Sequence, residues 1–76
     1  MNTIKVLKMC ADGYALNYSA VYNDAAYGIE ISASNGEYIL VEDVTPEIDE
    51  VMQFLQLLAD NLVFPSNALE VFDDLL

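Results

Sequence analysis

Two dipeptides constrain the fold of the first half of the chain more than any other feature of the sequence. Asp12-Gly13 and Asn35-Gly36 are preferred two-residue loops of antiparallel hairpins, because both loop positions need positive φ angles that Asp, Asn and Gly tolerate. A further reversal is expected at Asn23-Asp24. Since β-branched and aromatic residues alternate with polar ones between these points, the sequence predicts four antiparallel strands in a meander.

The first turn fixes which side chains share a face of the expected sheet. Around Asp12-Gly13, Met9 is expected opposite Leu16 and Leu7 opposite Tyr18. The apolar face of this hairpin then carries Leu7, Met9, Tyr14, Leu16, Tyr18, Ala20 and Tyr22. We expect this face to form the core beneath the helices, or alternatively to receive a partner, because tyrosine is common in protein interfaces.

The turn at Asn35-Gly36 sets the register of the last hairpin. A two-residue loop pairs Ala33 with Tyr38 and Ile31 with Leu40, and it places the Glu42 carboxylate on the apolar face. Residues 38–42 are apolar on both faces, which favours a strand that is central or covered on both sides.

The hydrophobic period changes near Thr45. Thr45, Pro46 and Glu47 suit the N-cap, the first helical position and the first turn of a helix. An apolar stripe at helical spacing follows, made of Ile48, Val51, Met52, Leu55, Leu58, Ala59 and Leu62. Asn61 is the expected C′ residue, which is the first position after the helix cap.

A second, shorter helix is expected from Pro65 to Leu76, with Glu70, Asp73 and Asp74 sharing one acidic face. Residues 1–76 therefore form one small α+β domain: a four-stranded antiparallel meander followed by two C-terminal helices packed on one sheet face.

Composition excludes several classes of chemistry. The chain has thirteen acidic residues against two lysines, with no arginine or histidine, and its formal net charge is −11. Phosphate clamps and the cationic contacts to nucleic acid or anionic lipid need Lys or Arg, and proton shuttling near neutral pH usually needs His. We therefore expect no enzyme activity, no catalytic residues, no cofactor, no metal site, no direct nucleic-acid binding and no membrane binding.

One cysteine indicates the cellular compartment. Cys10 has no second cysteine with which to form an intrachain disulfide, and it is expected to be a small buried apolar residue. No secretory signal or membrane-spanning run is recognisable. We therefore expect a cytoplasmic protein.

Two side chains of the first helix, Phe54 and Leu57, lie outside its apolar stripe and need another cover. Together with Glu70, Asp73 and Asp74 they are the candidate partner surface. The leading hypothesis is a non-enzymatic protein-interaction module or small regulator whose partners include basic proteins, and which forms a homodimer. The alternative is an acidic nucleic-acid mimic that inhibits a DNA- or RNA-binding protein.

The order of the motifs resembles that of a known group. Tyr27-Gly28-Ile29-Glu30-Ile31 precedes an acid-rich helix with Leu57-Leu58, then Val63-Phe64-Pro65, and the end of the chain from Leu69 to Leu76. Over residues 27–76 this resembles a family of short clostridial-type cytosolic proteins that is catalogued only as a domain of unknown function. The resemblance implies no activity, cofactor or catalytic residue.

Overall fold

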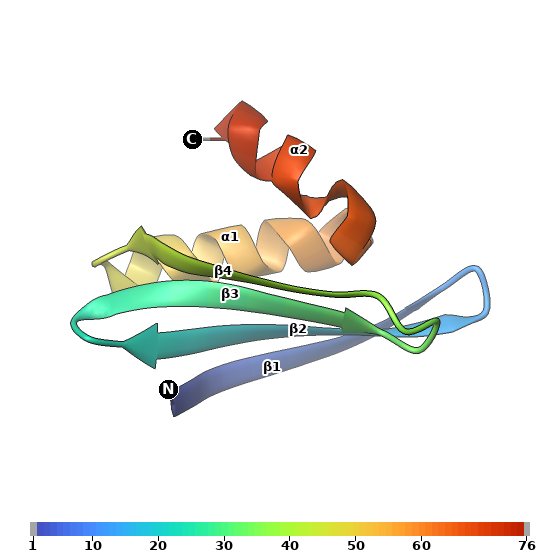
Figure 1. Cartoon of the computed structure of the whole chain (residues 1–76), viewed down its shortest axis with the longest axis horizontal. Coiled ribbons are helices and arrows are strands. Elements are labelled where there is room, and N and C mark those ends of the chain that lie inside the picture. Colours follow the sequence, from blue (N-terminus) through green and yellow to red (C-terminus); the bar gives the residue numbers. More distant parts are fainter. Residues whose placement is uncertain (1, 76) are drawn as a thin grey trace.

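The computed structural model, which describes residues 2–75, contains one antiparallel sheet and two helices (Figure 1). The strands are β1 (Asn2–Ala11), β2 (Tyr14–Asn23), β3 (Ala26–Ala33) and β4 (Tyr38–Thr45), and they lie in sequence order. The helices are α1 (Ile48–Asp60) and α2 (Pro65–Leu75). In Figure 1 both lie on the same side of the sheet, where α1 contacts all four strands and α2 contacts β3 and β4. The α+β meander predicted from the sequence is confirmed.

The first hairpin has the predicted turn and register. Asp12 and Gly13 have φ angles of 51° and 81°, as the two-residue loop requires. Met9 pairs with Leu16, and this register continues along β1 until an irregularity between residues 3 and 5. The next reversal falls one residue later than predicted, at Asp24 and Ala25.

The register predicted for the last hairpin is wrong by one residue. Ile31 pairs with Ile39, not with Leu40. The loop between β3 and β4 has three residues and not the predicted two, because the Ala33 N–H donates to the Glu37 carbonyl at 3.0 Å and Ser34 joins the loop. Only its last residue, Gly36, has a positive φ, which is the pattern of a three-residue loop.

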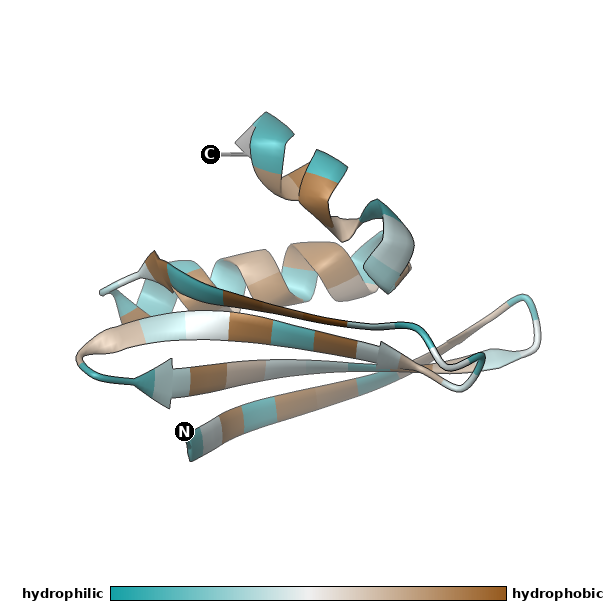
Figure 2. Cartoon of the chain, viewed as in Figure 1, coloured by the Kyte–Doolittle hydropathy of each residue, from teal (hydrophilic) through white to brown (hydrophobic). Residues whose placement is uncertain are grey.

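This shift in register moves Glu42 away from the core. Ile29 pairs with Val41, so Glu42 lies on the opposite face and is exposed. The strand is also at the edge of the sheet and not central. Figure 2 shows the hydrophobic middle of β4 followed by a hydrophilic segment, where Asp43 adopts a φ of 55° and the pairing with β3 is irregular.

The core fills the space between the sheet and the helices. Its buried members are Leu16, Tyr18, Ala20, Ile29 and Ile31 from the sheet, Val51, Leu55, Leu58 and Ala59 from α1, and Val63, Ala68 and Phe72 after it. These residues alternate along the strands and recur at helical spacing in α1, so the two periods bury their apolar side chains in one cluster.

The start of α1 differs from the predicted cap. The N-cap is Glu47, and Thr45 is the buried last residue of β4. The Thr45 hydroxyl accepts a hydrogen bond from the Glu47 N–H at 3.1 Å and donates one to the Glu50 carboxylate at 2.6 Å. Thr45 therefore stabilises the first turn of the helix from outside it.

Candidate functional site

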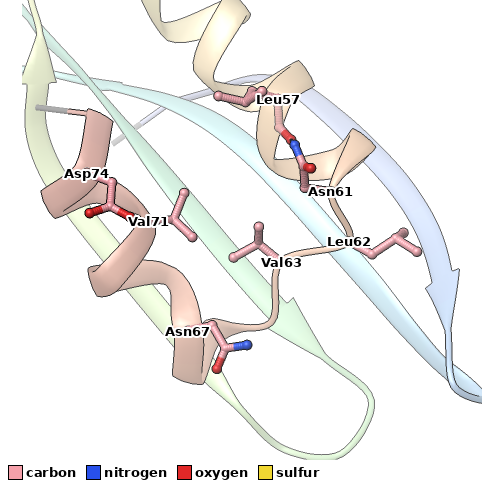
Figure 3. A pocket seen from close by; sticks show the side chains of 7 residues that line it. All are labelled: Leu57, Asn61, Leu62, Val63, Asn67, Val71 and Asp74. Carbon is pink, nitrogen blue, oxygen red and sulfur yellow. The ribbon is translucent and has the colours of Figure 1, made fainter.

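A groove opens between the end of α1 and α2. Its volume is about 460 Å³, and we call it the interhelical groove. Figure 3 shows the residues that line it: Leu57 from α1, Asn61, Leu62 and Val63 from the connection, and Asn67, Val71 and Asp74 from α2. The walls are mainly aliphatic, with two amides and one carboxylate, a composition typical of binding sites.

The way α1 ends shapes one side of this groove. The Val63 N–H donates to the Leu58 carbonyl and the Leu62 N–H to the Ala59 carbonyl, each at 3.1 Å. This pair of bonds is a Schellman motif with Asn61 as the C-cap and Leu62 at C′. The C′ residue predicted from the sequence, Asn61, was therefore wrong by one position.

Leu62 occupies a position that usually belongs to glycine. Its φ is 51°, in the left-handed region, where a side chain with a Cβ costs about 1–2 kcal/mol. The side chain is 37% exposed, so it recovers only part of the free energy that full burial of a leucine would give. The chain thus places a strained and partly solvated leucine on the groove wall.

The base of the groove is held by the sheet. The Tyr18 hydroxyl, in the core, donates a hydrogen bond of 2.9 Å to the Val63 carbonyl. Burial raises the pKa of this phenol above its ordinary value, which keeps it a hydrogen-bond donor at neutral pH. A residue of β2 therefore fixes the backbone that connects the two helices.

A second contact with the sheet holds the start of α2. The Ser66 N–H, in the first turn, donates to the Glu37 carboxylate at 3.0 Å, and the Asn35 amide donates to the other oxygen of that carboxylate. Hydrogen bonds from Ser66, followed by that from Asn35, lower the pKa of Glu37. The carboxylate is also placed where the helix dipole favours negative charge.

The surroundings of the groove are uniformly acidic. Asp74 lies on its rim, and Glu70 and Asp73 are exposed on the same helix. At the end of α1 the exposed Asp60 accepts a hydrogen bond of 2.8 Å from Gln56. Both lysines of the chain lie on β1, so neither helix contributes a positive charge. Positive charge on a ligand would therefore be attracted to this end of the molecule.

The two amides of the groove supply hydrogen-bonding groups. The Asn61 Nδ2 donates to the Leu57 carbonyl at 2.8 Å, which leaves its Oδ1 directed elsewhere as an acceptor. The Asn67 side chain lies at the first turn of α2, where its Oδ1 is 3.5 Å from the Ser66 hydroxyl. Asn61 thus offers an acceptor oxygen beside the aliphatic walls, and Asn67 offers its amide N–H groups as donors.

Only some of the residues predicted as a partner surface line the interhelical groove. Leu57, which is 39% exposed, and Asp74 both line the interhelical groove. Glu70 and Asp73 are exposed on α2 outside the lining, whereas Phe54 is half-buried against the core. Phe54 therefore has its cover within the chain.

Five lining residues were not part of the predicted surface: Asn61, Leu62, Val63, Asn67 and Val71. Asn61 was the available signal for the end of α1, because asparagine is common at a left-handed C′ position, but here the leucine after it adopts that conformation.

The face of the sheet away from the helices is mixed in character. Tyr38 is 58% exposed and donates a hydrogen bond to Glu30 on the neighbouring strand, and this bond is the main reason that its pKa is raised. Of the five tyrosines, only Tyr18 is fully buried. Cys10, expected to be buried, is exposed.

The described residues lack the features of two further classes of site. Among residues 2–75, no three Cys, Asp or Glu side chains converge closely enough to hold a metal ion. Within the same range, no helix combines the length and the apolar composition needed to cross a membrane.

Comparison with known proteins gives one match. A family model described as "Family of unknown function (DUF6514)" matches residues 3–76. The chain belongs to the DUF6514 family. Searches of curated proteins and of solved structures gave no significant match. The resemblance noted over residues 27–76 thus extends through the first hairpin, and every residue of the interhelical groove lies in the part that matches the DUF6514 family.

Proposed function

We propose that the protein is a non-enzymatic interaction module that docks another protein in the interhelical groove. The observation that supports this most is the groove itself, in which the exposed leucines Leu57 and Leu62 stand beside polar groups in an acidic setting. Such a mixture of apolar walls and a polar rim is the usual anatomy of a recognition site. Enzyme catalysis is disfavoured because, among the lining residues that the structure describes, Asp74 is the single ionisable side chain and has no second acid or base to work with it.

The test is a pull-down from a lysate of the source organism with matched variants. Leu57→Ser changes the groove, and Ile48→Ser changes a leucine-sized side chain of similar exposure, 44% against 39%, in the first turn of the same helix. We expect proteins that bind wild type and Ile48→Ser but not Leu57→Ser. Binding that is insensitive to Leu57→Ser would contradict docking in the groove.

A second candidate function is an acidic mimic that inhibits a nucleic-acid-binding protein. The exposed carboxylates of Glu70, Asp73 and Asp74 on one helix favour it. The remaining acids, however, are spread over the turns, both ends of α1 and the sheet, and do not form one row. Mimicry depends on charge, so a mimic should release its partner as salt rises, whereas apolar docking should persist.

We also propose a homodimer, for which the structure leaves fewer exposed apolar side chains than the sequence indicated. Since Phe54 packs within the chain, the surfaces left for a second copy are Leu57 and the open sheet face, which exposes Val6 and Tyr38. Sedimentation velocity at micromolar concentration tests this proposal, and a monomer would overturn it.

A cytoplasmic location and a clostridial-type origin are likewise proposals. The exposed thiol of Cys10 has no second cysteine in the chain, which fits a reducing compartment. Fractionation of the source cells tests the location, and recovery outside the cytoplasmic fraction would contradict it.

A further inference from the structure

We propose that the occupant of the interhelical groove is a peptide segment with an aliphatic anchor flanked by Lys or Arg. This inference rests on the proposed docking function and specifies the chemistry of the partner. It follows from three observations: the apolar walls of the groove, its acidic surroundings, and the strained backbone conformation of Leu62 in its lining.

The walls select the anchor. In Figure 3, Leu57 from α1 and Val71 from α2 lie beside Val63, whereas Leu62 lines the groove from the connection with its side chain pointing away from Val63. A groove of about 460 Å³ is large enough for one or two aliphatic side chains and is within the usual range of ligand sites. A polar or charged side chain placed there would lose hydration without enough partners to replace it.

The charges select the flanking residues. Asp74 stands on the rim, with Asp60 at the end of α1 and Asp73 on α2, while both cations of the chain are on β1. A segment that carries acids beside its anchor would meet repulsion from these carboxylates and from the net charge of −11. Lys or Arg beside the anchor would be attracted on approach and would face the rim once bound.

The strained conformation of Leu62 indicates that this residue contributes to more than the stability of the fold. Glycine would adopt the same C′ geometry without strain and would leave the Schellman hydrogen bonds unchanged, because these bonds are made by the backbone. The leucine side chain is therefore not needed for the hydrogen bonds of the helix end, and it lies at the edge of the groove. Removing it should weaken binding while the fold keeps or gains stability.

The chain itself contains one segment of the required kind, Lys5-Val6-Leu7-Lys8. This segment is part of β1 and pairs with β2, so its backbone is already engaged in the sheet. We therefore assign the groove to a segment of another protein, and binding of a second copy is an outcome that the experiment can detect.

The experiment uses the full chain and three labelled 12-residue peptides, followed by fluorescence anisotropy. The first peptide has two central leucines flanked by lysines, the second replaces the lysines with glutamates, and the third replaces the leucines with serines. We expect the first to bind at least about tenfold more tightly than either of the others, because each of the others lacks either the matching charge or the apolar anchor. A tenfold ratio needs only a small difference in binding free energy. Its affinity should fall only in part as NaCl is raised, because salt screens the flanking charges while the apolar anchor stays bound.

Three variants then locate the binding. Leu62→Gly should weaken binding of the first peptide about tenfold with no decrease in the midpoint of thermal unfolding, a combination that a purely structural leucine cannot give. Asp74→Asn should weaken binding and reduce its salt dependence. Asp24→Asn is the charge-matched control, because Asp24 lies in the exposed β2–β3 turn and Asn tolerates its positive φ of 50°.

The outcomes separate this inference from the proposed function. If the glutamate-flanked peptide binds as tightly as the lysine-flanked one, the charge of the occupant is refuted and docking in the groove stands. If Leu62→Gly binds as wild type does, or if no peptide binds while the chain sediments as a dimer, the proposed occupant is refuted. Whether partners depend on Leu57 in the pull-down decides the docking function independently.

Discussion

The hydrogen bond from Tyr18 to the Val63 carbonyl makes a quantitative prediction about stability. Tyr18→Phe removes only the hydroxyl and leaves the buried ring in place. Among the described residues no other donor reaches that carbonyl, so the change leaves a buried acceptor without a partner. An acceptor left unsatisfied costs about 1–3 kcal/mol, and the phenol itself no longer has to be desolvated, so we expect a net loss of about 1–2 kcal/mol.

Urea unfolding followed by circular dichroism measures this loss. The midpoint should fall with an unchanged slope, because the surface exposed on unfolding is nearly the same. For a domain of this size each kcal/mol corresponds to roughly 4–8 °C in the melting temperature. Amide hydrogen exchange should also speed up at residues 62 and 63, since the connection between the helices loses its tie to the sheet.

Tyr14→Phe is the matched control for this prediction. Tyr14 is on the same strand, its side chain is exposed, and its contact with Phe64 is an edge-to-face packing of rings 6.1 Å apart that does not use the hydroxyl. We expect a change within about 0.5 kcal/mol. A loss below about 0.3 kcal/mol for Tyr18→Phe, or an equal loss for Tyr14→Phe, would refute the argument that the buried hydrogen bond holds the connection.

Three further substitutions test other parts of the fold. Gly28→Ala should destabilise the protein by about 1–3 kcal/mol in urea unfolding, because a Cβ there would lie 2.6 Å from the Val41 carbonyl oxygen of β4. Ala25→Gly should raise stability by about 0.5–1 kcal/mol, since its φ of 69° strains an alanine more than the added chain entropy of glycine costs; a loss would contradict this. Glu37→Gln should lower the melting temperature at pH 7. Because the pKa of Glu37 is lowered in the folded protein, its ionised carboxylate stabilises the fold at pH values above its ordinary pKa of about 4.5. This stabilisation is lost as the pH falls through the lowered pKa of the folded state. The melting temperatures of the variant and the wild type should therefore converge in acid.

The sequence was sufficient for the fold class because local signals and hydrophobic period agreed. Asp12-Gly13 has positive φ at both positions, which dictated the first hairpin and its register. The stripe of α1 was predicted well in its centre, where Val51, Leu55 and Leu58 are buried. It was less accurate at its ends, because Ile48 is 44% exposed and Leu62 lies beyond the end of the helix.

The last hairpin shows why the same kind of signal failed. Asn35-Gly36 suits both a two-residue and a three-residue loop, and the contacts of the fold decide between them. The Asn35 side chain accepts a hydrogen bond of 2.9 Å from the Glu37 N–H, and Ser34 bonds in both directions with Ala15 on β2. These contacts lie partly outside the hairpin, so a pattern of neighbouring residues could not reveal them.

The groove could not be predicted for a related reason, since its geometry depends on two contacts between distant parts of the chain. Tyr18 and Val63 are 45 residues apart, and Glu37 and Ser66 are 29 apart. The first joins β2 to the connection between the helices and the second joins the β3–β4 loop to the start of α2, so the sheet helps to set the angle at which α2 leaves α1. It follows that changes at Tyr18 or Glu37 should alter binding in the groove although neither residue lines it. Changes on the open face of the sheet should leave binding unaltered.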